Sequence, residues 1–172
     1  MGTRKRSTKK WPLVFTYRGR VTGKEFAARV VCSSRVLAEQ LADGSLWLSG
    51  SEPGWFAAGG PSLKEANDNL KKLFHGILLD KAEECDDFAE FRRLMVAAFE
   101  DADRLVRKEW VDLWIENQDG KLDCTPMEQE RLPRVVQEET SVWVEVIEAL
   151  PTADEGTLET RRTQDVRYAV AA

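Results

Sequence analysis

The chain has 172 residues, of which 42% are hydrophobic and 32% are charged, with a formal net charge of −5. This composition is typical of a folded globular protein and excludes an intrinsically disordered chain. No apolar run approaches the roughly 20 residues that a membrane-spanning helix requires. We therefore expect one medium-sized domain, or a small domain with an elaborated second half, and no membrane partner.

The residue types that most often build catalytic and metal sites are sparse. The three cysteines, Cys32, Cys85 and Cys124, are far apart, which argues against a disulfide framework and against a zinc site. The only histidine, His75, has no acid or nucleophile one helical turn away. We therefore expect no catalytic residues, no metal and no cofactor, and a reducing cytoplasmic setting.

Basic residues gather at the N-terminus. Residues 1–10 contain five of the 25 lysines and arginines and no acid, so the rest of the chain carries 20 basic and 30 acidic side chains. The five are Arg4, Lys5, Arg6, Lys9 and Lys10. Such an arm is typical of a solvated, disordered terminus, and it also suits contact with a nucleic-acid backbone.

Residues 11–51 carry the signals of antiparallel strands. The segments WPLVFTYRG and VTGKEFAARVVCSS predict a hairpin around Thr22 and Gly23. The next two segments, RVLAEQL and SLWLSG, flank Asp43-Gly44, a dipeptide that favours a tight hairpin turn. The pattern predicts at least three strands.

A helix is expected to begin after Ser62. Ser62 and Glu65 form an S-x-x-E capping box, in which side chains satisfy unpaired backbone N–H groups. An apolar stripe follows at three- and four-residue spacing: Leu63, Ala66, Leu70, Leu73, Phe74, Ile77 and Leu78. Because glycine weakens a helix, Gly76 suggests a close packing contact.

A second, long helix is predicted over residues 87–116, with a break expected near Asp103. Its wide apolar face must be covered either by the C-terminal segment or by a second copy of the chain. The second alternative predicts a homo-oligomer.

The C-terminal third gives weaker signals. Residues 117–123 match the middle of a calcium-binding EF-hand loop, but Ile115 and Pro126 stand where the terminal ligands belong, so we interpret the segment as a turn that ends a helix. A short helix is predicted from Thr125 to Pro133. TSVWVEVIEAL fits both a strand and a helix, and its β-branched residues favour a strand. TLETRR and VRYAVA are further strand candidates.

The stretch from Arg35 to about Leu79 resembles the HicB antitoxin family. The matching residues are a DG hairpin, a P-G turn and a G-x-x-S-x-x-E-A helix start: Asp43, Gly44, Pro53, Gly54, Gly59, Ser62, Glu65, Ala66 and Asn69. The resemblance implies an α+β, partial ribonuclease-H-like module over residues 11–85, with three to four antiparallel strands covered by a helix. Residues 86–172 would form an α+β extension.

From the resemblance and the acidic body we expect a non-enzymatic protein that binds and neutralises a small, basic, RNA-cleaving toxin. Trp55, Phe56 and Trp47 are the candidate partner-binding residues, provided that they are exposed. A nucleic-acid-associated regulator using the arm of residues 1–10 is the alternative hypothesis. A third is a hydrolase or nuclease whose acids assemble only in the folded chain.

Overall fold

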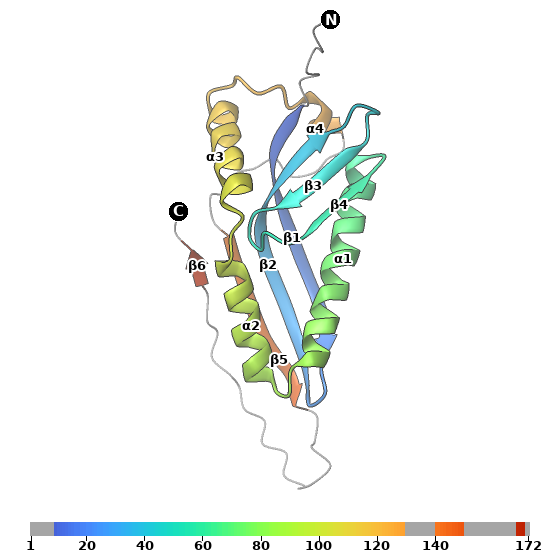
Figure 1. Cartoon of the computed structure of the whole chain (residues 1–172), viewed down its shortest axis with the longest axis vertical. Helices are drawn as coiled ribbons and strands as arrows, with labels where there is room; N and C mark the ends of the chain where they lie inside the picture. The colour runs from blue at the N-terminus through green and yellow to red at the C-terminus, as the bar shows by residue number, and fades with distance from the viewer. Residues whose placement is uncertain (1–8, 130–139, 150–167, 171–172) are drawn as a thin grey trace, which may run out of the picture.

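The computed structural model describes residues 9–129, 140–149 and 168–170. They form an α+β fold with a curled antiparallel sheet and helices packed on it (Figure 1). The first half contains β1 (Lys10–Thr22), β2 (Phe26–Gln40), β3 (Leu46–Gly50), β4 (Ala57–Gly60) and α1 (Leu63–Glu84). The second half contains α2 (Phe88–Glu100), α3 (Arg104–Gln118), α4 (Thr125–Gln129), β5 (Thr140–Ala149) and β6 (Tyr168–Val170).

Strand β2 is the centre of the sheet. On one side it pairs with β1 along almost its whole length. On the other side β3 pairs with residues 36–40 and β5 pairs with residues 26–33, so two strands share one edge of β2 end to end. Ser34 and Arg35 lie between them, and we call this interruption the notch. Strand β4 extends the sheet beyond β3, and β6 extends it beyond β5.

Both predicted hairpins are present. The chain turns after Thr22 to join β1 to β2, and again around Asp43 and Gly44 to join β2 to β3. Gly44 has a φ of 90°, a conformation that glycine adopts without steric cost. The separate strands expected between residues 26 and 41 are one continuous strand of 15 residues.

Helix α1 packs on the inner face of the curled sheet. The Ser62 side chain caps the helix by accepting a hydrogen bond from the backbone N–H of Glu65. One stripe of the helix is buried in the core: Leu63, Ala66, Leu70, Phe74, Leu78 and Ala82. Burial of each larger apolar side chain stabilises the fold by about 1.5–3 kcal/mol. The close contact expected at Gly76 is absent, because a Cβ there would meet no atom within 4 Å.

The long helix predicted over residues 87–116 is divided into α2 and α3 close to Asp103, where the break was expected. The chain leaves helical geometry at residues 101–103, and Asp103 caps α3 by accepting hydrogen bonds from two backbone N–H groups. Helix α2 lies on the inner face beside α1, where Phe91 packs against Phe26 and Phe99 against Phe74. The apolar face of α2 is therefore covered within one chain, whereas Leu105 and Ile115 of α3 are exposed. The expected homo-oligomer stays a prediction.

Helix α3 lies on the opposite, outer face of the sheet. Its Trp110 ring lies beneath the guanidinium group of Arg35. Arg35 directly precedes Val36 in β2, and because the Val36 side chain faces the inner core, the Arg35 side chain faces outward. The connection from α2 to α3 runs beside the notch, where the backbone N–H of Asp103 donates to the carbonyl of Ser51 at 2.8 Å.

The C-terminal segment completes the same sheet. TSVWVEVIEAL forms β5, as its β-branched residues predicted, and β5 pairs with β2. The expected division between residues 11–85 and 86–172 therefore does not separate two sheets. Helix α4 begins at Thr125 as predicted, and VRYAVA contains β6. TLETRR and Pro133 lie outside the described residues.

In the described part of the chain, none of the helices is both long and apolar enough to cross a membrane.

Candidate functional site

A buried ion pair occupies the notch. Nη1 of Arg35 lies 3.0 Å from Oε1 of Glu52, and each residue is only 2% exposed. The hydroxyl groups of Ser51 and Thr140 donate to Oε2 of Glu52, and Nε of Arg107 lies 3.6 Å from Oε1. Opposite charges and hydroxyl donors thus compensate the cost of burying the carboxylate.

This ion pair connects four elements. Arg35 belongs to β2, Glu52 to the loop after β3, Arg107 to α3 and Thr140 to the start of β5. The hydroxyl group of Ser34 also donates to the backbone carbonyl of Glu52. Because the Glu52 carboxylate is enclosed, a substrate does not reach it in this conformation. The arrangement fixes the position of the β3–β4 loop relative to the sheet.

That loop presents Trp55 at the surface. The Trp55 ring stacks on Phe74 of α1 with centroids 6.5 Å apart and packs edge-on against Phe56 at 6.2 Å. Trp55 is nevertheless 42% exposed. A large aromatic side chain held rigidly against the core, with one side in solvent, has the properties of an interface anchor.

The other two candidate partner-binding residues differ from Trp55. Phe56 is 1% exposed and packs between Phe15 and Phe74, so it is a core residue and unavailable to a partner. Trp47 is 42% exposed, but strand alternation places it on the outer face, over Gly59. The structure therefore does not bring the three aromatic residues together on one surface.

The described part of the N-terminal arm is paired with acids. Lys10 lies in β1, so the arm ends before it, and its Nζ is 2.7 Å from Oε1 of Glu109 and 3.9 Å from Glu39. Lys9 lies 3.9 Å from Asp123. Arg4, Lys5 and Arg6 lie outside the described residues.

His75, Tyr17 and Cys32 form a small group between α1 and the sheet. The phenol oxygen of Tyr17 is hydrogen-bonded to Nδ1 of His75 at 2.5 Å. Burial, with a smaller contribution from Cys32, raises the pKa of Tyr17. Burial also raises the pKa of Cys32 to about 12. The thiol therefore stays protonated near neutral pH and lacks the thiolate that a cysteine nucleophile requires.

The residues that carry the HicB resemblance have local structural roles. The Asn69 side chain donates to the carbonyl of Gly59 at 3.0 Å and ties α1 to β4. A Cβ at Gly60 would lie 2.6 Å from the backbone nitrogen of Ala66. The backbone N–H of Gly54 donates to the carbonyl of Asp101, which places the P-G turn against the α2–α3 connection.

Sequence reasoning missed the Arg35–Glu52 pair, because nothing local relates two charged residues 17 positions apart. The only available signal is that Arg35 interrupts a run of small and apolar residues in β2. Sequence reasoning also missed a row of hydroxyl side chains across three strands, which depends on strand register.

The turn over residues 117–123 follows α3, as expected. Gly120 has a φ of 69°, and Asp119 pairs with Lys121 at 2.7 Å. Among residues 9–129, 140–149 and 168–170, no three acidic, histidine or cysteine side chains are grouped so that they could hold a metal ion.

In comparisons with known proteins, no family model matches the chain, and neither a curated protein nor a solved structure matches it.

Proposed function

We propose that the chain is a non-enzymatic protein-interaction module that acts as a HicB-like antitoxin and neutralises a small, basic, RNA-cleaving toxin. The observation that carries the proposal is Trp55, which is supported by Phe74 and Phe56 and remains 42% exposed. Rigid aromatic anchors lose little conformational entropy on binding, and they are enriched among the residues that dominate interface energies.

Two further features support this proposal. The element order runs from antiparallel strands into a helix that packs across them, which is the arrangement the HicB resemblance implies. Beyond the first ten residues the chain carries 30 acidic and 20 basic side chains. An excess of negative charge speeds association with a basic partner and favours it over acidic competitors.

The partner surface is expected to centre on the loop that carries Trp55. This loop is held by the Arg35–Glu52 pair and is therefore positioned before binding. Preorganisation of this kind reduces the ordering cost that association would otherwise impose.

The test is to express the chain together with small basic proteins encoded beside its gene and to measure complex formation by calorimetry. Trp55→Ala should weaken the complex by about 30-fold or more, which corresponds to roughly 2 kcal/mol at an anchor residue. Trp47→Ala is the matched control, because it removes an equally exposed tryptophan from the outer face and should leave affinity nearly unchanged. Failure of every such protein to bind, or equal effects of the two substitutions, would contradict the proposal.

A further inference from the structure

Among the described residues, α3 covers the outer face of the sheet near the notch. Beyond the notch, β1, β2 and β5 carry polar side chains on this face. Thr16, Ser33 and Ser141 are direct register neighbours on these three strands, so their hydroxyl groups form one row across the sheet. In the next row, Arg18 on β1 neighbours Val31 on β2. We call these five residues the open face. Thr16, Arg18 and Ser141 are exposed, and Ser33 and Val31 are half-buried.

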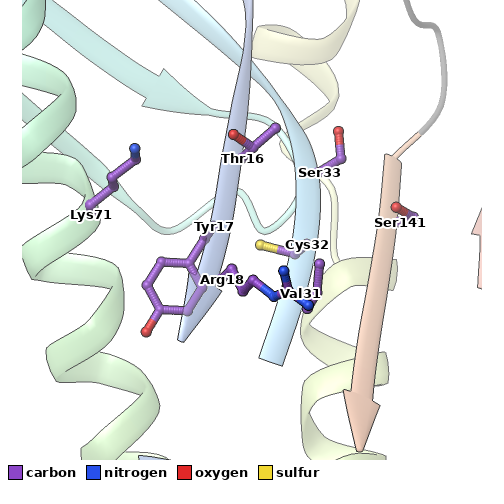
Figure 2. Close-up of a pocket in the computed structure, with 8 residues that line it drawn as sticks. All are labelled: Thr16, Tyr17, Arg18, Val31, Cys32, Ser33, Lys71 and Ser141. Atoms are coloured by element: carbon purple, nitrogen blue, oxygen red, sulfur yellow. The ribbon is translucent and has the colours of Figure 1, made fainter. Parts of the chain in front are cut away.

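A pocket of about 560 Å³ is lined by the open face and also by three residues from the inner side of the sheet, Tyr17, Cys32 and Lys71 of α1. Figure 2 shows its lining, with Thr16, Ser33 and Ser141 on neighbouring strands and Lys71 on α1, beyond β1 in this view. The other lining residues are Arg18, Val31, Tyr17 and Cys32. The pocket is shallow and opens along the sheet, unlike the enclosed cavities that bury most of a small ligand.

The charge of this pocket is opposite to that of the protein. Two cationic side chains, Arg18 and Lys71, line it, and none of its lining residues in the described part of the chain is a carboxylate, although the chain has a net charge of −5. The acid of the adjoining row, Glu145, lies 3.3 Å from Arg29, so its charge is already compensated. A local cation excess on an acidic protein favours an anionic ligand.

The hydroxyl row supplies hydrogen-bond donors beside these charges. Oγ of Ser33 is shielded from solvent and has no hydrogen-bond partner within the described residues. Thr16 and Ser141, at the two ends of the row, are exposed, so their hydroxyl groups are the ones that a ligand in the pocket can reach. Hydroxyl and cationic side chains together are the groups that contact phosphate oxygens in nucleic-acid complexes.

We infer that the open face, together with Lys71, binds the phosphate backbone of a single-stranded nucleic acid. Three neighbouring strands span only about 10 Å, which suits one strand of backbone. Sheets that recognise nucleic acids typically hold single strands on an open face of this kind. Val31 adds a small apolar contact in the middle of the polar surface. The inference does not depend on the proposed protein partner, since Trp55 packs against the inner-face residue Phe74.

The test is fluorescence anisotropy of the full chain with labelled 12-nucleotide single-stranded DNA and RNA at several salt concentrations. Each lost phosphate contact lowers the slope of log affinity against log salt by about 0.7, so Arg18→Ala with Lys71→Ala should lower it by about 1.4. At low salt this double variant should bind at least about tenfold more weakly. Lys64→Ala with Lys81→Ala is the matched control, since it removes two exposed α1 lysines outside the pocket and should bind like the original chain.

Two further measurements test whether the open face holds the strand and whether it requires an oligomer. A chain lacking residues 1–8 should retain most of the affinity, because the open face and not the N-terminal arm holds the strand. Inorganic phosphate and mononucleotides should compete only at concentrations far above those of the oligomer. The inference fails if no salt-dependent binding occurs, if the pocket variant and the control bind equally, if removal of residues 1–8 abolishes binding, or if free phosphate competes as well as the oligomer. Circular dichroism of each variant ensures that a loss of binding does not reflect unfolding.

Discussion

The guanidinium group of Arg35 and the carboxylate of Glu52 lie 3.0 Å apart, and both side chains are almost completely buried. They lie where β3 and β5 meet along the edge of β2, and they bring α3 and the Trp55 loop to the same point. Such a pair is often no more stabilising than apolar residues of the same volume, but removing one partner leaves a buried charge uncompensated.

Glu52→Ala should therefore lower the free energy of unfolding by about 3–5 kcal/mol, measured by urea denaturation. Asp68→Ala is the control, because it breaks the exposed ion pair with Lys64 and should leave stability nearly unchanged. A double variant, Arg35→Met with Glu52→Leu, should be more stable than Glu52→Ala, since it leaves no fully buried charge unpaired and Arg107 is partly exposed. If Glu52→Ala lowers the free energy of unfolding by less than about 1 kcal/mol, the Arg35–Glu52 pair is not required for the stability of the fold.

Two glycines should respond in opposite directions to the same substitution. Gly60→Ala should lower the free energy of unfolding by about 1–3 kcal/mol, because the new Cβ would lie 2.6 Å from the backbone nitrogen of Ala66. Gly76→Ala should raise it by about 1 kcal/mol, since a helical Cβ there meets no neighbour within 4 Å. Thermal and urea unfolding of both variants test the two predictions. A change of the same sign in the free energy of unfolding of both variants would contradict the packing of α1 on β4.

The break between α2 and α3 depends on the cap at Asp103. Asp103→Ala should lower the free energy of unfolding by about 1 kcal/mol, because the backbone N–H groups of Leu105 and Val106 lose their acceptor. Asp112→Ala removes an exposed acid from the interior of the same helix and should have a much smaller effect. Equal losses in urea titrations of the two variants would argue for one continuous helix.

The buried thiol of Cys32 should make stability fall at alkaline pH. Its pKa is raised to about 12 in the folded chain, whereas an unperturbed thiol ionises near pH 8.5. Between these values the unfolded chain binds fewer protons, so this contribution is complete below about pH 8.5 and decreases as the pH rises towards 12. From pH 8 to pH 10 the free energy of unfolding should fall by about 2 kcal/mol more in the original chain than in Cys32→Ala. Cys124→Ser changes a less buried thiol and should keep the steep pH dependence of stability seen in the original chain. Identical pH profiles for the original chain and Cys32→Ala would contradict the prediction.

Local sequence signals were sufficient for several elements. The Ser62 cap and the apolar stripe from Leu63 to Leu78 defined α1, and the Asp43-Gly44 turn defined the β2–β3 hairpin, because each rests on contacts within a few residues. The β-branched residues of TSVWVEVIEAL identified β5 in the same way. The break expected near Asp103 is also present, because α2 ends at Glu100 and Asp103 caps the start of α3.

Tertiary structure decided what these elements contact. The alternation in β5 would fit any neighbouring strand, and only the fold places β5 on the same edge of β2 as β3, leaving the notch for Arg35 and Glu52. The solvent exposure of aromatic side chains also depends on the tertiary structure, since Trp55 and Phe56 are adjacent in sequence but only Trp55 reaches solvent. The row of Thr16, Ser33 and Ser141 arises from the register of three strands, which is set by packing over the whole sheet and is not encoded in a short stretch of sequence. The sequence by itself thus determined the fold class and the local turns and caps, while long-range packing determined which polar and aromatic groups face solvent and each other.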